Sequence, residues 1–397
     1  MIITFWISIF IIFYAFAGYG IILYFLVLFK RKFFSNTLHY YSFEALPTAT
    51  LIIAAFNEAD IIRQKIDNTL ALKYPANKLK IVIVTDGSSD GTHNIVEQFP
   101  QIILLHNNER KGKINAVHRA MEKISTEIVI FTDANTFLNT DALINIARHY
   151  KNEKVGAVAG EKRVQIDTSS DATAGEGFYW KYESALKKWD SELYSVVGAA
   201  GELFSIRTAL YKPVSNDIIL DDFMLSMNIA MMGYKIVYEP EAYAIETSSA
   251  NVKEELKRKI RIAAGGIQSI IRLKGLFNLI KYPVLSFQYI SHRVLRWTIT
   301  PFLLVLVFLV SIYLLFTEFS LLYALLLLMQ IIFYTAAAAG WLLQKKQIKI
   351  KILFIPYYFC LMNVAVVAGI IRYIKGTQQA AWDKAKRKDA IPLIISE

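Results

Sequence analysis

Two long apolar stretches near the ends of the chain constrain its fold more than any other sequence feature. Residues 2–29 contain no charged side chain, and the first one in the sequence is Lys30. Apolar residues dominate again beyond residue 297. One helix needs about 20 apolar residues to cross a bilayer core, and both stretches are long enough for that. The residues between them have the composition of an ordinary globular protein, although 55% of the 397 residues are hydrophobic. The sequence therefore predicts a membrane protein with an inserted soluble domain.

The first stretch predicts an uncleaved transmembrane anchor. It is longer than the apolar core of a signal peptide, and no basic region precedes it. Lys30, Arg31 and Lys32 follow it directly, and basic residues stay on the cytosolic side of a span, so the domain that follows is expected in the cytosol. Three further spans are expected at residues 297–316, 320–343 and 353–374.

The sequence leaves open on which side of the membrane the C-terminal tail lies. Four spans place the tail outside, whereas the positive-inside rule places its basic residues inside: Lys384, Lys386, Arg387 and Lys388. Either the last segment, which contains Pro356, is broken and re-entrant, or the tail is an exception to the rule. The expected divisions are an anchor at 1–30, a cytosolic domain at 31–250, amphipathic interface helices at 251–292, three spans within 293–376 and a basic tail at 377–397.

The middle of the chain alternates between strand and helix patterns. Short β-branched runs of period two alternate with segments of helical spacing, a pattern typical of an α/β fold with a parallel sheet covered by helices on both faces. The predicted strands are Ala49–Ala55, Leu79–Val84, Ile102–Leu105 and Ile128–Phe131, and the helices are Ile61–Leu72, Thr92–Gln98 and Lys113–Ile124. The sequence contains neither GxGxxG after the first strand nor GxxxxGK[ST], which argues against a dinucleotide-binding domain and a P-loop.

Polar clusters follow three of the predicted strands. They are Asn57-Glu58, Asp86-Gly87-Ser88 and Asp133-Ala134-Asn135. Ligands of such sheets bind beyond the carboxyl ends of the strands, so we expect the three clusters to meet in one crevice. Asp86 can accept a hydrogen bond from a base or ribose. Asp133 and Asn135 can hold a divalent cation that bridges two phosphates, while a turn or a helix cap is the alternative interpretation of this segment.

Two further polar segments have both a functional and a structural interpretation. Lys111-Gly112-Lys113 precedes a predicted helix, where lysine can contact a diphosphate, although a solvated basic loop has the same composition. Asp221 and Asp222 follow an apolar stretch, and one carboxylate raises the proton affinity of its neighbour, as a general base requires. The alternative is that this pair caps the helix expected at Phe223–Met232.

The basic residues favour contact with a membrane surface. A net charge of +11 suits nucleic acid, anionic lipid or a phosphorylated substrate. The basic residues gather beside apolar segments, and Lys253–Gln268 combines them with apolar residues at helical spacing. This segment predicts an amphipathic helix at the membrane surface, and no nucleic-acid partner is expected. Cys360 is the single cysteine, which excludes an internal disulfide.

In this order and spacing the motifs resemble the family 2 glycosyltransferases, in particular the membrane synthases of cellulose, hyaluronan and poly-N-acetylglucosamine. The resemblance covers roughly residues 48–275. It implies a GT-A (Rossmann-like) fold with a mostly parallel sheet, flanked by transmembrane helices. It also implies an inverting transfer of a hexose-type sugar from a UDP-sugar, with Mg²⁺ or Mn²⁺ as the divalent cation.

The resemblance also implies roles for individual residues. Donor binding falls to Glu58 near the nucleotide, Asp86 at uracil, Lys113 at the diphosphate and Asp133 at the metal, with Asn135 as the second metal ligand. Asp222 corresponds to the general base of the T-E-D element, with Asp221 in the place of the glutamate. Arg261 corresponds to the arginine of Q-x-x-R-W on an interface helix.

The sequence departs from the family pattern at several further positions. Thr85 replaces the first aspartate of Asp-Asp-Gly, and Asn135 replaces the second of D-x-D, so one metal ligand is neutral. Arg258 and Ile262 stand where the glutamine and the tryptophan of Q-x-x-R-W occur. In polymerising synthases that tryptophan lines the acceptor site, so its absence bears on processivity.

Three function classes remain. The first is a glycosyltransferase that adds one sugar to a lipid-linked or glycan acceptor, in exopolysaccharide or surface glycan biosynthesis at the plasma membrane. The second is a processive polysaccharide synthase that also secretes its β-linked product. The third is a transporter or channel with a nucleotide-sensing domain, which is disfavoured because no charged residue interrupts the spans at mid-membrane depth. Ile262 favours the first class over the second.

Overall fold

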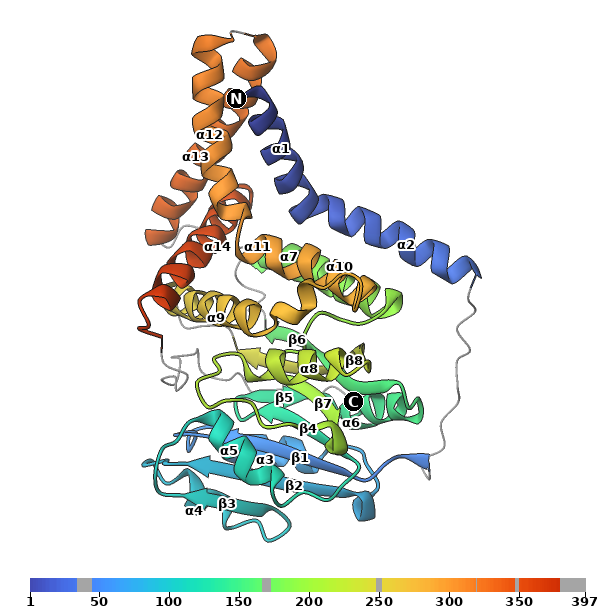
Figure 1. Cartoon of the computed structure of the whole chain (residues 1–397). Helices are drawn as coiled ribbons and strands as arrows, with labels where there is room; N and C mark the ends of the chain where they lie inside the picture. Colours follow the sequence, from blue (N-terminus) through green and yellow to red (C-terminus); the bar gives the residue numbers. More distant parts are fainter. Residues whose placement is uncertain (34–44, 166–172, 248–251, 319, 347–349, 379–397) are drawn as a thin grey trace. The chain divides into compact units, whose positions relative to one another are not determined.

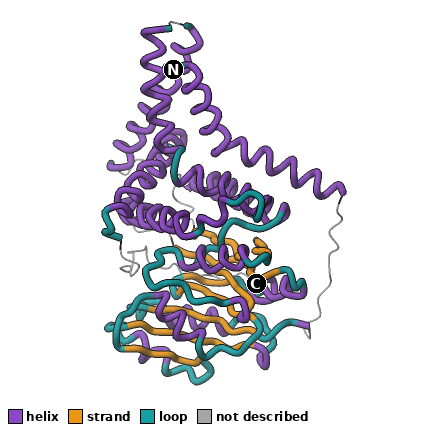
Figure 2. Tube along the Cα trace, in the orientation of Figure 1, coloured by secondary structure: helices purple, strands orange, loops and turns teal. Residues whose placement is uncertain are grey.

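The computed structural model describes residues 1–397 except 34–44, 166–172, 248–251, 319, 347–349 and 379–397 (Figure 1). The described residues form two compact units. The α/β unit contains Arg31–Gln165 and Lys187–Glu255, and the helical unit contains Met1–Lys30, Ile166–Leu186 and Leu256–Gln378. All strands of the described chain belong to the first unit, and Figure 2 shows them in orange.

The α/β unit is built on one mixed, mostly parallel sheet. Its eight strands have the order β3-β2-β1-β4-β7-β6-β8-β5. The run from β3 to β4 is parallel, as predicted, and β6 pairs with β8 in parallel. The strands β7 and β5 pair antiparallel with their neighbours, so the sheet is not parallel throughout. The strand bounds are β1 Ala49–Ala55, β2 Leu79–Asp86, β3 Ile103–Asn107, β4 Ile128–Asp133, β5 Thr136–Leu138, β6 Val155–Gln165, β7 Leu203–Arg207 and β8 Lys235–Thr247.

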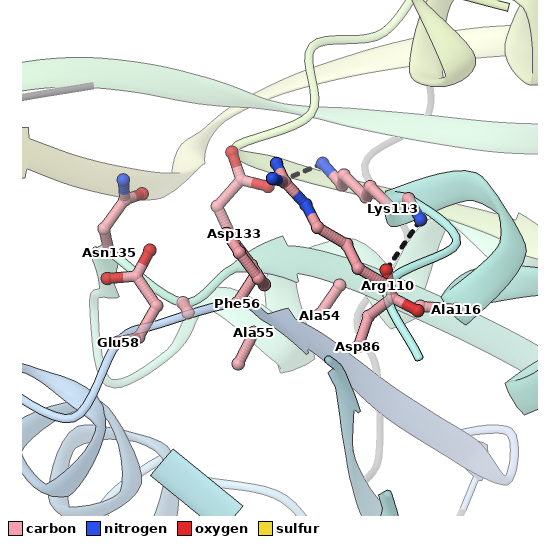
Figure 3. A pocket seen from close by; sticks show the side chains of 12 residues that line it. Ala54, Ala55, Phe56, Glu58, Asp86, Arg110, Lys113, Ala116, Asp133 and Asn135 are labelled. Atoms are coloured by element: carbon pink, nitrogen blue, oxygen red, sulfur yellow. Dashed lines mark hydrogen bonds and ion pairs between the residues drawn. The ribbon is translucent and has the colours of Figure 1, made fainter. Parts of the chain in front are cut away.

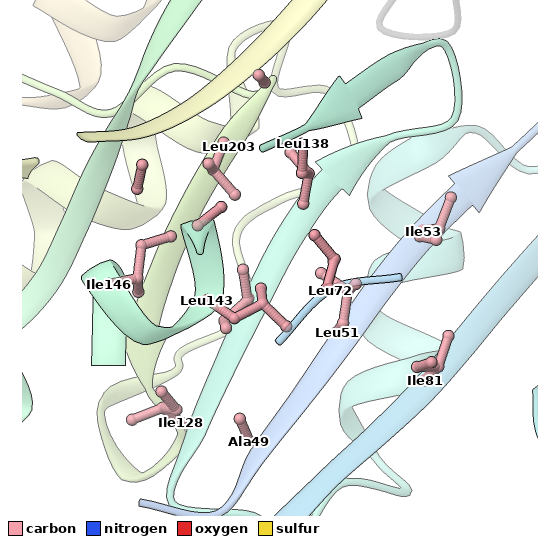
Figure 4. Close-up of a cluster of buried hydrophobic side chains, with 14 of the residues drawn as sticks. Ala49, Leu51, Ile53, Leu72, Ile81, Ile128, Leu138, Leu143, Ile146 and Leu203 are labelled. Atoms are coloured by element: carbon pink, nitrogen blue, oxygen red, sulfur yellow. The ribbon is translucent and has the colours of Figure 1, made fainter. Parts of the chain in front are cut away.

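Helices cover both faces of this sheet. Its helices are α3 Ile62–Leu70, α4 Thr92–Val96, α5 Lys113–Met121, α6 Ala142–Ala147 and α8 Asp221–Met231, with short 3-10 turns at Ala76–Lys78, Arg148–Lys151 and Thr208–Leu210. α3, α4 and α6 contribute to one buried cluster with alternate residues of the strands, such as Leu51 and Ile53 of β1 (Figure 4). α5 contacts β1 and β2 but lies outside that cluster, so it covers the opposite face. Side chains alternate between the faces of a strand, which is why strands buried on both faces are apolar throughout.

The helical unit contains four helices that are long and apolar enough to cross a membrane. They are Ile2–Phe33, Thr300–Thr317, Leu321–Lys345 and Ile352–Ile374. The four spans expected from the sequence correspond to these four helices. The remaining elements include α9 Val252–Arg272, which confirms the predicted amphipathic helix, and α7 Thr173–Leu193, which crosses the boundary between the units. The rest of the helical unit is η6 Lys274–Phe277, α10 Pro283–Tyr289, η7 Ile290–Val294 and α11 Leu295–Trp297.

Two details of this unit bear on the sequence predictions. Pro356 lies inside α14, Lys351–Ile374, and does not end it, so the helix lacks the break that the re-entrant alternative assumed. Proline there removes only one amide donor near the start of the helix, and the turns that follow keep theirs. The basic tail residues beyond residue 378 lie outside the described part of the chain. The first span contains one π-helical segment, η1 Tyr14–Gly18, between α1 Ile2–Phe13 and α2 Tyr19–Phe33.

Candidate active site

A pocket lies at the carboxyl ends of β1, β2 and β4. The parallel register pairs Ala54 of β1 with Asp133 of β4 and Ala55 with Thr85 of β2, so all three strands end at the same edge. The side chains that follow these ends point into one space (Figure 3). The lining residues are Ala54, Ala55, Phe56, Glu58, Asp86, Arg110, Gly112, Lys113, Ala116, Asp133, Ala134 and Asn135. The structure thus brings together the three strand-end clusters, and with them Lys113.

The loop after β1 is held in place by the loop after β2. Asn57 has a positive φ of 54°, and its side-chain oxygen accepts a hydrogen bond from the backbone N–H of Ser89 at 2.8 Å. The backbone N–H of Glu58 donates to Thr92 Oγ1 at 2.9 Å, and that of Ala59 donates to Asp90 Oδ2 at 2.9 Å. Asparagine tolerates the left-handed conformation better than most residues, so this position suits the turn that directs Glu58 into the pocket.

Asp86 orders the loop that carries Lys113. Its Oδ2 accepts hydrogen bonds from the backbone N–H groups of Lys111 at 3.0 Å and Gly112 at 2.6 Å. The loop approaches so closely that a Cβ on Gly87 would lie 2.6 Å from the nitrogen of Arg110, and Gly87 has a φ of +67°. Only glycine fits there without displacing the loop. The N–H of Lys111 also lies 3.2 Å from Asp86 Oδ1, so both oxygens of Asp86 accept from this loop, and its predicted contact with a base stays a prediction.

An aromatic ring and a guanidinium form one wall of the pocket. The guanidinium carbon of Arg110 lies 3.9 Å from the ring centroid of Phe56. Both residues line the pocket together with Asp86. A flat pair of this kind suits a planar base or a phosphate, since guanidinium groups stack on rings and fork onto phosphate oxygens. Neither residue was predicted from the sequence as part of the site, although Phe56 directly precedes Asn57-Glu58 and Arg110 directly precedes Lys111-Gly112-Lys113.

Lys113 and Asp133 form an ion pair in the centre of the pocket. Lys113 Nζ lies 2.6 Å from Asp133 Oδ1, and about a quarter of each side chain is exposed (26% and 25%). Burial alone would lower the pKa of Lys113, but Asp133, Asp221 and Asp222 outweigh it and raise that pKa above its ordinary value. The ammonium therefore stays charged at every physiological pH.

A buried lysine supports the segment of Asp133 from below. Lys65 of α3 is fully buried, and its Nζ donates to the carbonyl oxygen of Thr136 at 2.6 Å and to Thr132 Oγ1 at 3.2 Å. Burial lowers the pKa of Lys65 to about 7, against the opposing effect of the Asp133 carboxylate. These bonds fix the β4–β5 connection that carries Asp133 and Asn135.

Asp222 lies beside Lys113. A Cβ placed on Gly201 would lie 3.2 Å from Asp222 Oδ2 and 3.4 Å from Lys113 Nζ, so both groups border the same glycine. Asp221 and Asp222 open α8, where Asp222 Oδ1 accepts a hydrogen bond from the N–H of Phe223 at 2.8 Å. Burial and the charge of Asp221 raise the pKa of Asp222 to about 7, although Lys113 opposes this shift. A carboxyl group that titrates near neutral pH suits a general base.

A buried charge network lies next to this carboxylate. The ammonium of Lys162 on β6 pairs with carboxylates of Glu202 and of Glu246 on β8. Burial alone would raise the pKa of Glu202, but Lys162 holds it below its ordinary value. Glu202 in turn contributes to the raised pKa of Asp222, and its carbonyl oxygen accepts from Thr132 Oγ1 at 2.9 Å. This network was not expected from the sequence, because Lys162 stands between Glu161 and Arg163 and does not differ from its neighbours in charge density.

The pocket fits a hard divalent cation in its donor chemistry. Carboxylate and amide oxygens of Glu58, Asp133 and Asn135 line it, and Asp133 already has a cationic partner in Lys113. Within the described residues, no three His, Cys, Asp or Glu side chains lie close enough to hold an ion by themselves. Magnesium commonly takes one or two protein carboxylates and completes its shell with substrate phosphates. Asp133 and Asn135 would therefore hold a cation jointly with a bound diphosphate.

Arg261 lies on α9, whose residues from Leu256 onward belong to the helical unit. Its assignment stays a prediction. The same holds for the individual roles of the residues that line the pocket.

Comparison with known proteins gives a family match for part of the chain. The sequence model of glycosyl transferase family 2 matches residues 50–214. The poly-beta-1,6-N-acetyl-D-glucosamine synthase of Staphylococcus aureus (strain MSSA476) is 28% identical over 240 residues, which are 58% of this chain and 57% of the relative. The Staphylococcus epidermidis protein of the same description is 26% identical over 230 residues, covering 56% and 55%. The chain thus spans little more than half the length of the curated relatives it matches.

A solved structure resembles nearly the whole chain. It is a mannosyltransferase from Pyrobaculum calidifontis in complex with GDP-Man and Mn²⁺, with a TM-score of 0.70 and 23% identity. The likeness covers 94% of this chain and 100% of that one, and it establishes the fold. The sheet order and this likeness show a fold of the GT-A type. Residues 50–214 thus match glycosyltransferase family 2, and the chain is distantly similar to the poly-N-acetylglucosamine synthases.

Proposed function

We propose that this protein is an inverting glycosyltransferase that moves a sugar from a UDP-sugar to an acceptor hydroxyl at the plasma membrane, with its α/β unit in the cytosol. The acceptor is lipid-linked or a glycan, and the product belongs to an exopolysaccharide or a surface glycan. The observation that carries the proposal is the position of Asp222. Its carboxyl group has a pKa of about 7 and borders the same glycine as Lys113, which pairs with Asp133 in the pocket.

The donor half of the reaction uses the pocket. Phe56 and Arg110 flank the base, and Lys113 binds the diphosphate after it leaves Asp133 Oδ1. A divalent cation, when bound at Asp133 and Asn135, supplies positive charge that offsets the charge building on the leaving diphosphate. The neighbouring mannosyltransferase structure, which contains GDP-Man and Mn²⁺, supports a nucleoside diphosphate donor and a metal-dependent reaction.

The acceptor half uses Asp222. Its carboxylate takes the proton of the acceptor hydroxyl as the oxygen attacks the anomeric carbon, and the bond to the diphosphate breaks on the opposite face. Asp221 and Glu202 keep the proton affinity of Asp222 high enough for this transfer. Arg261 of the amphipathic helix adds positive charge toward the diphosphate in this proposal.

A second candidate is a processive synthase that polymerises a β-linked glycan. The similarity to poly-beta-1,6-N-acetyl-D-glucosamine synthases favours it, whereas Ile262 at the tryptophan position favours single addition. The length of the product made by purified protein separates the two: single addition gives one sugar per acceptor, and processive synthesis gives long chains at low enzyme concentration.

The proposal is tested by a nucleotide-release screen on the full chain in lipid nanodiscs. UDP-sugars and GDP-sugars are supplied with a membrane lipid extract as acceptor source, with Mg²⁺, with Mn²⁺ or with a chelator. We expect UDP release that requires a divalent cation and acceptor extract. Release from GDP-sugars alone would overturn the UDP assignment, and release unaffected by the chelator would overturn the metal assignment.

A further inference from the structure

The helical unit contains a buried cluster of charged residues that have no part in the proposed reaction. This arginine cluster consists of Glu183 on α7, His292 and Arg293 on η7, and Arg296 on α11. Glu183 Oε1 lies 2.8 Å from Arg293 Nη1 and 3.1 Å from His292 Nε2, and its Oε2 lies 3.3 Å from Arg296 Nη1. The side chain of Glu183 is only 5% exposed.

The cluster carries more positive than negative charge. Burial alone would raise the pKa of Glu183, but Arg293, His292 and Arg296 lower it well below its ordinary range, so the carboxylate is ionised. Two guanidinium groups remain protonated at every accessible pH and face this one carboxylate. Even with His292 neutral, one positive charge is left without a counter-charge among the residues of the cluster.

Both arginines also keep unused donors at buried positions. Arg293 Nε and Arg296 Nη2 are buried from solvent and have no hydrogen-bond partner among the described residues. A buried donor without a partner destabilises the fold, and more so when it is charged. The excess charge and the unused donors both indicate an anion that completes the cluster. The side chain of Arg293 is 18% exposed and that of Arg296 is 11% exposed, which leaves a path for a ligand.

Two π-helical turns bring these groups together. η1 of the first span and η7 are linked by a hydrogen bond of 2.7 Å between Tyr14 and Ser291. Arg296 Nε donates to the carbonyl oxygen of Ala15 at 2.9 Å. Single π-turns within helices are rare and occur mostly at functional sites, and here two of them contact the same cluster.

We propose that the arginine cluster binds the phosphate of an anionic lipid headgroup. Arg293 stacks at 5.6 Å from the ring centroid of Trp297, and the first span after them begins at Thr300. Tryptophan next to the start of a span marks the headgroup level of a membrane, where phosphate is the prevailing anion. Basic pockets between helices at this depth bind anionic headgroups, and a guanidinium fork matches two phosphate oxygens. This proposal does not depend on the glycosyltransferase function.

The structure provides two variants with opposite expected effects. Arg293→Gln removes the excess charge but leaves Glu183 paired with Arg296, so no buried charge is stranded. Glu183→Gln instead removes the carboxylate that competes with a bound anion, and the guanidinium groups of Arg293 and Arg296 both keep their positive charge. Arg372→Gln removes an exposed arginine from another helix of the same unit and is the matched control.

Native mass spectrometry of the full chain in detergent measures the binding of phosphatidylglycerol and of phosphatidylcholine. We expect the unmodified chain to bind phosphatidylglycerol more tightly than phosphatidylcholine. Arg293→Gln should bind phosphatidylglycerol about tenfold more weakly than the unmodified chain, since one charge-assisted hydrogen bond is worth about tenfold in affinity. Glu183→Gln should bind it as tightly as the unmodified chain or more tightly. Arg372→Gln binds as the unmodified chain does. Equal binding of the two lipids, or unchanged binding by a folded Arg293→Gln variant, would overturn the proposal. Displacement by inorganic phosphate at millimolar concentration would overturn the lipid source.

Discussion

Replacement of Lys113 by methionine separates the proposed roles of the pocket. Methionine keeps most of the length and volume of the side chain but removes the ammonium that lies 2.6 Å from Asp133 Oδ1. A charge-assisted hydrogen bond contributes about 1.5–3 kcal/mol. If the same ammonium contacts the diphosphate of the donor, its loss weakens the binding of UDP about 10- to 150-fold.

The same substitution has a second, independent consequence for pH dependence. Lys113 Nζ and Asp222 Oδ2 lie 3.4 Å and 3.2 Å from the Cβ position of Gly201, so their separation is at most about 6.6 Å. At an effective dielectric constant of about 20–40, a charge at that limiting distance is worth about 1.3–2.5 kcal/mol, or one to two pKa units. Because the ammonium lowers the pKa of Asp222, its removal moves the rising limb of the pH–rate profile to higher pH.

Titration calorimetry with UDP and a pH series of turnover measure the two effects. Lys111→Met is the matched control, since the Lys111 side chain is 56% exposed and pairs with Glu109. Binding within twofold of the unmodified chain would show that Lys113 does not contact the diphosphate. A shift of the profile to lower pH would contradict the assigned electrostatics.

Three further outcomes follow from the same site. The pKa of Asp222 is raised from 3.8 to about 7 in the folded state, so between these pH values the native state binds more protons than the unfolded state. The melting temperature should therefore fall as the pH rises from about 4 to about 7, and Asp222→Asn should remove that decline. Lys162→Met leaves two buried carboxylates without their cation and should destabilise the α/β unit by about 3–5 kcal/mol, measured as a lower melting temperature, whereas adding Glu202→Gln should recover part of the loss. Gly198→Ala should lower both stability and turnover, because Gly198 has a φ of +85° and its Cβ would lie 2.1 Å from a ring carbon of Phe223, next to Asp222; an unchanged melting temperature would contradict that packing.

Local patterns predicted much of the fold. The expected strand Ala49–Ala55 has the same bounds in the structure, and the other expected strands and helices of the first half differ from it by a few residues at their ends. The four spans were equally visible, because each depends on a continuous apolar run. The position of β7, antiparallel between β4 and β6, was not predictable, since the pairing of distant strands leaves no local pattern.

The candidate site was predictable only in part, for a related reason. Strand ends carry their own signal, so Asp86 and Asp133 were found from sequence, while their partners come from other segments. Lys65 follows the buried positions of α3, with Ile62, Ile66 and Thr69, so a lysine on the apolar face of that helix was a signal available in the sequence. The pairing of Lys162 with Glu202 had no such signal, because the two residues meet only through the register of β6 and β7.

The most direct test of the account is the Asp222→Asn variant of the full chain, assayed for both UDP binding and sugar transfer. Asparagine keeps the shape of the side chain but cannot accept the proton of the acceptor. Asp217→Asn, which alters an exposed carboxylate of the preceding loop, is the control. We predict that Asp222→Asn binds UDP within about threefold of the unmodified chain and loses transfer by at least about 10²–10⁴-fold, the usual contribution of a general base. Transfer at the unmodified rate would contradict the proposed active site.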